Sequence, residues 1–130
     1  MEITYIGHSG FLMEWDHCYW LFDYYKGSIP VLDSGKKLFV FSSHKHADHF
    51  NPEIFSLKKQ YRNVEYILSF DIRVPKEYRE TEDAGQGWLL SVKPRREYLL
   101  QDMQGHRIIL KTLRSTDCGV AFLLTYQGKT

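Results

Sequence analysis

The stretch LFVFSSHKHADHF, residues 38–50, joins an apolar run to a cluster of side chains that bind metals. Residues 38–41 are apolar at every position, which is typical of a strand covered on both faces. Residues 44–49 then hold three of the chain's six histidines and an aspartate. The stretch therefore predicts a buried strand that carries a metal site at its carboxyl end.

The spacing of the four side chains predicts how they share metal. Neutral imidazole is a common ligand for zinc, and His44 and His46 would project to the same face of an extended chain, so both can reach one ion. Asp48 and His49 follow where the chain turns toward Pro52, and we expect them to hold a second ion. Paired ions about 3.5–4 Å apart clamp a shared hydroxide and polarise the group that it attacks. The alternative is a histidine-rich surface tract with no role, or one that binds metal adventitiously.

Alternating and apolar runs predict a sheet-rich chain with one helix. We expect strands over residues 1–6, 11–15, 18–23, 38–41, 64–70, 88–92, 97–100, 106–113 and 120–126. Short links join the first three into an antiparallel meander, and we expect the strands after residue 88 to be antiparallel too. Asn51 as N-cap, Pro52 in the first turn and apolar side chains at helical spacing predict a helix over 52–61. Residues 71–87 are polar and should form a surface excursion, partly helical.

The composition of the chain limits its structural class and its possible partners. With 130 residues, 43% hydrophobic and 25% charged, the chain should form one domain. A net charge of +1 argues against a nucleic-acid partner, and no apolar segment is long enough to cross a membrane. The start of the chain lacks the pattern of a signal peptide. Two cysteines, Cys18 and Cys118, fit free thiols in a reducing cytoplasm, although a bridge between them stays open.

The motif at residues 44–49 resembles the His-x-His-x-Asp-His signature of the metallo-β-lactamase-fold superfamily, which also follows a buried strand and precedes a helix. Residues 5–14, YIGHSGFLME, resemble that family's first hairpin, and Leu21-Phe22-Asp23 resembles the strand that delivers an aspartate beneath the metals. Residues 115–124, STDCGVAFLL, are similar to a later motif in the branch of ascorbate-6-phosphate lactonase and its uncharacterised relatives. The resemblance covers essentially the whole chain.

The resemblance implies a fold and an activity. The fold would be α+β, a metallo-β-lactamase-like αββα sandwich, with residues 1–130 forming an incomplete domain. This N-terminal half would have a mostly antiparallel or mixed sheet and one or two helices. The activity would be that of a metal-dependent hydrolase, in which a metal-bound hydroxide attacks an ester, lactone or phosphodiester of a small-molecule substrate. The cofactors would be two divalent metal ions, with zinc as the expected metal and manganese or iron as alternatives.

The resemblance also assigns roles to single residues and exposes a departure. Asp48 would orient the hydroxide besides binding metal. Asp23 would orient a ligand histidine, or would merely satisfy turn amides at a strand end. The family's further histidine is missing from residues 114–118, where Asp117 or Cys118 could substitute. Alternatively, the side chains of residues 115 and 116 make turn hydrogen bonds and nothing there binds metal.

Two other functions stay open from the sequence. A metal-binding or degenerate module without turnover would explain the missing histidine, and a homo-oligomer could supply the other half of the site in trans. A nucleic-acid processing enzyme is the third, and the absence of a basic stripe in the sequence argues against it.

Overall fold

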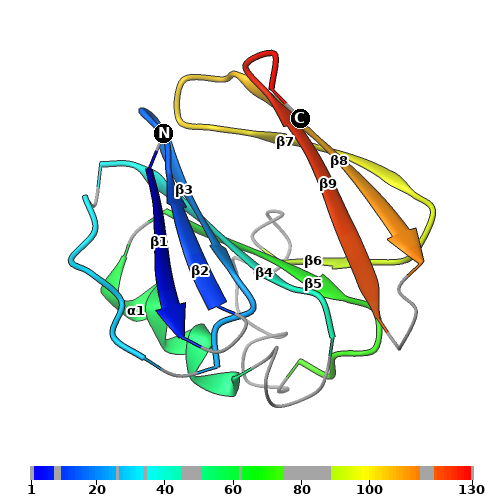
Figure 1. The fold of residues 1–130 in the computed structure, drawn as a ribbon, viewed down its shortest axis with the longest axis horizontal. Coiled ribbons are helices and arrows are strands. Elements are labelled where there is room, and N and C mark those ends of the chain that lie inside the picture. Colours follow the sequence, from blue (N-terminus) through cyan, green and yellow to red (C-terminus); the bar gives the residue numbers. More distant parts are fainter. Residues whose placement is uncertain are drawn as a thin grey trace.

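The computed structural model describes residues 2–7, 10–25, 27–33, 35–44, 51–61, 63–74, 89–114 and 119–129. These residues form two β-sheets that face each other, with one short helical segment on the outer side of the larger sheet (Figure 1). The larger, or first, sheet has the strand order β1-β2-β3-β4-β5-β6, and the second sheet has the order β7-β8-β9. Among the described residues, no helix has the length and apolar character needed to cross a membrane.

The first sheet is antiparallel at one side and parallel at the other. Its strands are β1 (Glu2–Gly7), β2 (Gly10–Glu14), β3 (Cys18–Phe22), β4 (Lys37–Ser42), β5 (Val64–Ser69) and β6 (Leu89–Val92). The pairs β1–β2 and β2–β3 are antiparallel, so the predicted meander is confirmed. The pairs β3–β4, β4–β5 and β5–β6 are parallel, so the expected antiparallel arrangement of β6 is wrong. Residues 38–42 are buried, as the apolar run predicted.

The second sheet is an antiparallel meander of β7 (Glu97–Gln101), β8 (Arg107–Arg114) and β9 (Val120–Tyr126). Aromatic side chains fill the space between the two sheets. Phe41 of β4 stacks on Phe22 of β3 with ring centroids 4.7 Å apart, and it meets Phe122 of β9 edge-on at 5.3 Å. Further toward the other end, Trp15 and Tyr126 pack edge to face at 5.0 Å. This aromatic layer is the core that joins the sheets.

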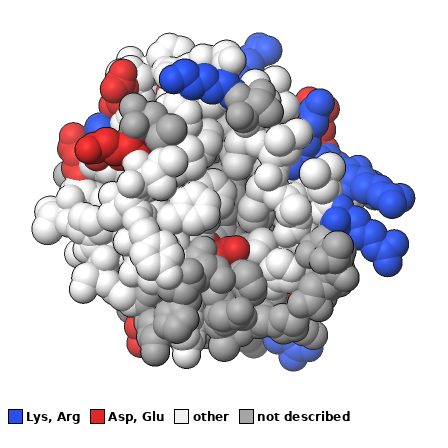
Figure 2. Space-filling model, viewed as in Figure 1, with Lys and Arg blue, Asp and Glu red and all other residues white. Residues whose placement is uncertain are grey.

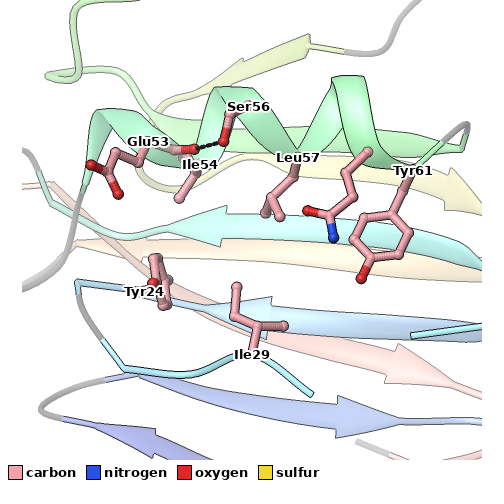
Figure 3. Close-up of a pocket in the computed structure, with 8 residues that line it drawn as sticks. Tyr24, Ile29, Glu53, Ile54, Ser56, Leu57 and Tyr61 are labelled. Atoms are coloured by element: carbon pink, nitrogen blue, oxygen red, sulfur yellow. Dashed lines mark hydrogen bonds between the residues drawn. The ribbon is translucent and has the colours of Figure 1, made fainter. Parts of the chain in front are cut away.

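The helical segment covers the other face of the first sheet. It begins as a 3-10 helix at Pro52–Ser56 and continues as a single α-helical turn, α1, at Leu57–Gln60. As predicted, Asn51 caps it, since its side chain accepts a hydrogen bond from Glu53 N. Ile54 and Leu57 point from this segment toward Tyr24 and Ile29 (Figure 3), around a pocket of about 220 Å³.

The predicted α+β class is wrong, because the described residues are dominated by strands and contain only this short helical segment. The apolar spacing over 52–61 correctly predicted a helical segment with one buried face. The segment ends at Tyr61, where φ is −120° and ψ is 137°. Asn63 O then accepts a hydrogen bond from Leu38 N, which returns the chain to the sheet. The partly helical surface excursion expected over 71–87 lies mostly outside the described residues.

Candidate functional site

The parallel strands bring the residues that follow them to one edge of the first sheet. Asp23 follows β3, Ser43 and His44 follow β4, Phe70 follows β5, and Lys93 follows β6. Because parallel strands end at the same edge, these residues form a row along that edge. The carboxyl edge of a parallel sheet is where ligands bind in open α/β sheets, and here it holds the one described member of the histidine motif.

A hydrogen-bond chain links Asp23 to His44 through Ser43. Asp23 Oδ1 accepts from Ser43 N at 2.7 Å, and Asp23 Oδ2 accepts from Ser43 Oγ at 2.7 Å. Ser43 Oγ in turn lies 2.8 Å from His44 Nδ1. Asp23 adopts φ +46°, a left-handed conformation that aspartate tolerates better than most residues, while its own N–H donates to Phe41 O at 2.8 Å. The backbone of Asp23 is thus hydrogen-bonded to β4, the strand that Ser43 follows.

This chain determines which nitrogen of His44 carries the proton. The Ser43 hydroxyl has a single hydrogen, and the ionised Asp23 carboxylate can only accept, so that hydrogen goes to Asp23. Ser43 Oγ must then accept from His44 Nδ1–H. The lone pair of the neutral imidazole therefore lies on Nε2, the nitrogen that a metal would use. Asp23 thus accepts from a main-chain amide and also reaches His44 through Ser43, and its role toward a metal ligand stays a prediction.

The second sheet is fastened to the same point. Val120 N, at the start of β9, donates to Ser43 O at 2.9 Å. Ser43 therefore holds β9 with its carbonyl group and His44 with its hydroxyl group. Ser43 was not singled out from the sequence, because a serine beside a histidine is common and only the fold shows that Asp23 lies within reach of it.

An open pocket of about 530 Å³ borders this hydrogen-bond chain. Asp23, Ser43 and His44 supply its polar wall. Apolar side chains from both sheets supply the rest, among them Phe11, Met13, Trp20, Phe22, Phe122 and Leu124. A group that binds here would have one polar end near His44 and an apolar body between the sheets.

The other predicted site residues cannot be placed. His46, Asp48 and His49 lie outside the described residues, as do Asp117, Cys118 and residues 115 and 116. Among the residues that the structure does describe, no three His, Cys, Asp or Glu side chains form a group able to hold a metal. The two-ion ligand set therefore stays a prediction, and His44 is its only described member.

A second polar cluster, which sequence reasoning missed, lies at the opposite end of the sandwich. The buried carboxylate of Asp102 accepts from Tyr126 OH at 2.5 Å and from Gln104 N and His106 N, and it lies 3.0 Å from His106 Nδ1. Burial raises the pKa of Asp102, but these hydrogen bonds outweigh it and leave the pKa below its usual value. Cys18 nearby is a buried free thiol, as expected, and burial raises its pKa to about 11.

The chain matches no protein-family model and no curated protein.

Proposed function

We propose that the chain carries the metal site of a metal-dependent hydrolase acting on an ester, lactone or phosphodiester. The observation that carries this proposal is the hydrogen-bond chain from Asp23 through Ser43 to His44. A carboxylate that fixes the tautomer of a histidine is a recurring partner of metal-binding histidines. The resemblance of residues 44–49 to the metallo-β-lactamase superfamily supports the same reading.

The donor set fits divalent metal. His44, with its lone pair on Nε2, offers a neutral nitrogen ligand, and residues 45–49 add two further imidazoles and a carboxylate in sequence. When bound, two zinc, manganese or iron ions would lower the pKa of water toward about 7 and polarise the group under attack.

The chain's own groups would do the remaining work. Asp23 and Ser43 hold His44 in one orientation and one tautomer, which lowers the entropy lost on metal binding. The apolar wall of the bordering pocket would receive the hydrocarbon part of a substrate and exclude water from it. Asp48 would orient the nucleophilic water.

The metal site can be tested without any activity assay. Isothermal titration of Zn²⁺ into the metal-free protein should show binding about 10–100-fold weaker for Ser43→Ala, because His44 loses its orienting partner. Ser42→Ala is the matched control, since Ser42 Oγ is buried one residue away and has no hydrogen-bond partner among the described residues. Equal Zn²⁺ affinities for the two variants would contradict the proposed role of Ser43. Stoichiometric metal retained by His46→Ala would contradict the proposed metal site.

Turnover is a separate measurement. Ester, lactone and phosphodiester substrates should be hydrolysed with Zn²⁺ or Mn²⁺, and His46→Ala should abolish that hydrolysis. Metal binding that depends on Ser43 and His46, together with no turnover of any substrate, would instead identify a metal-binding module without catalysis.

A further inference from the structure

Two histidines from different sheets lie side by side at the end of the sandwich that holds Asp102. The rings of His17 and His106 have centroids 5.7 Å apart, and their planes are inclined at 33°. His17 lies in the turn between β2 and β3 of the first sheet, and His106 lies in the turn between β7 and β8 of the second sheet. Both turns lie at the upper end of the molecule in Figure 1. We call these two side chains the histidine pair.

The buried carboxylate of Asp102 determines which nitrogen of His106 is free to bind a metal. Asp102 Oδ2 lies 3.0 Å from His106 Nδ1, and Asp102 Oδ1 accepts a hydrogen bond from His106 N at 2.9 Å. Because the ionised carboxylate can only accept, Nδ1 carries the proton and the lone pair lies on Nε2. A carboxylate in this position is a recurring partner of metal-binding histidines. The His106 side chain is 52% exposed, so an ion can approach it from solvent.

The second ring, that of His17, has no competing role within the described part of the chain. Its contact with His106 is the one interaction that its side chain makes there. Either of its nitrogens can therefore offer a lone pair, because no hydrogen bond from the described residues fixes the tautomer. The pair thus combines one imidazole that is held in place with one that can adjust to it.

The spacing of the rings suits two ligands of one ion. Zinc lies about 2.0–2.1 Å from an imidazole nitrogen, so two rings that share a tetrahedral ion have centroids roughly 5–5.5 Å apart. The observed 5.7 Å needs only a small side-chain rotation to reach this range. The fold therefore brings together two imidazoles that are far apart in the sequence, at a distance that permits chelation.

The histidine pair is separate from the candidate metal site at His44. His17 precedes β3 and Asp23 follows it, so roughly 20 Å lies between these positions at the usual rise per strand residue. Figure 2 shows charged side chains of both signs along the upper margin of this face, where the two turns lie in Figure 1. General charge therefore gives a cation little preference for this place, and the two imidazoles must supply the affinity.

We infer that the histidine pair binds one divalent transition-metal ion, which joins the two sheets at the end remote from His44. His17 and Nε2 of His106 supply two ligands, and water fills the remaining positions. Imidazole sites favour Cu²⁺ over Zn²⁺ in the usual order of affinities, so copper should bind more tightly. The unfolded chain does not hold the two histidines together, so the ion stabilises the folded state. This inference does not rest on the proposed function.

The histidine pair is tested in a parent protein that carries His44→Ala and His46→Ala, so that the histidine motif contributes little. Cu²⁺, and Zn²⁺ less strongly, should raise the thermal unfolding midpoint of this parent. Adding His17→Ala, which leaves the contact between Asp102 and His106 intact, should abolish the rise. Loss of a ligand should weaken binding at least as much as loss of an outer-shell partner, which costs about 10–100-fold in affinity.

Two further variants of the parent sharpen the result. His106→Ala should also abolish the rise, and combining it with His17→Ala should cause no further loss, because one imidazole alone no longer chelates. Asp16→Asn is the matched control, since it changes the charge beside His17 and keeps both imidazoles. No rise in the parent, a rise that survives His17→Ala, or an equal loss in Asp16→Asn would overturn the inference.

The two proposed metal sites can fail separately. The histidine pair would still hold an ion in His46→Ala, so metal retained by that variant counts against the histidine motif only when His17→Ala is also present. If residues 44–49 bind no metal and the rise that depends on His17 persists, the proposed function is refuted and the histidine pair stands. The opposite result would refute the histidine pair alone.

Discussion

Gly119 lies so close to Ser43 that a Cβ atom built on the glycine would stand 2.0 Å from the Ser43 carbonyl oxygen. The same Cβ would be 3.1 Å from His44 Cα, and Gly119 has φ +84°. The start of β9 therefore touches the main chain that carries the candidate metal ligand, and only glycine permits this approach.

Gly119→Ala should destabilise the protein and weaken Zn²⁺ binding together. A left-handed conformation alone costs a non-glycine residue about 1–2 kcal/mol, and the clash with main-chain atoms must add to this by moving β9 or His44. Gly105→Ala is the matched control, because Gly105 has φ +83° but no atom within 4 Å of its Cβ position. Urea unfolding should show the larger loss for Gly119→Ala, and equal losses would contradict the close approach.

Asp102→Asn should lower stability at neutral pH, by about 1.5–3 kcal/mol, because a buried charged acceptor is replaced by a neutral amide. Since the pKa of Asp102 is lowered by folding, its contribution is present above the unfolded pKa of 3.8 and is lost as pH falls through the folded pKa. The difference between wild type and variant in urea midpoint should therefore shrink between about pH 7 and about pH 3.

His106 also contacts Asp102, so the contribution of its imidazole must be separated from that of the carboxylate. The same pair of measurements in a His106→Gln background removes the imidazole charge. A difference that stays constant with pH in this background would show that the Asp102 carboxylate is not stabilised by folding.

Cys18 should resist alkylation in the folded protein. Burial raises the pKa of its thiol to about 11, and the reactive thiolate is therefore scarce near neutral pH. In a Cys118→Ser variant, iodoacetamide labelling followed by mass spectrometry should be slow at pH 8 and become complete in urea. Rapid labelling without urea would mean that the end of the sandwich near Tyr126 opens readily.

Phe41→Ala should cost about 3–5 kcal/mol, because it removes a fully buried ring that contacts aromatic side chains of both sheets. Leu99→Ala is the control, since Leu99 is 56% exposed on β7, and it should cost less than about 1 kcal/mol. Thermal unfolding of the two variants compares them directly. Similar losses would indicate that the aromatic layer does not hold the sheets together.

Local sequence patterns predicted the strands well. Alternating and continuous apolar residues reflect which faces of a strand are buried in the sheet. The strands 18–23, 64–70 and 120–126 agree with the structure to within a residue. The pairing partner and direction of each strand were harder to predict. The sequence of residues 88–92 contains no signal that β6 pairs in parallel with β5. The helical segment predicted over 52–61 ends at Gln60, within a residue of the expected end, but its first five residues form a 3-10 helix rather than an α-helix.

Spacing alone predicted the candidate site only where its residues are consecutive, and Asp23 was included through the family resemblance. The histidine motif can be read directly, but Asp23 and Ser43 meet through strand pairing across 20 positions. A pocket lined by basic side chains at the turn after β6 was missed for the same reason. Lys93, Arg95 and Arg96 are near each other in sequence, whereas Arg114 joins them only because Thr112 binds the turn after β6.

The edge position of β9 has a consequence for how the protein behaves in concentrated solution. Residues 120–126, VAFLLTY, carry no charge, and Leu123 is 41% exposed. An edge strand of this kind has no electrostatic guard against pairing with the same strand of another copy. Leu123→Lys would place a repelling charge at the centre of any such pairing and should lower self-association in concentrated solution.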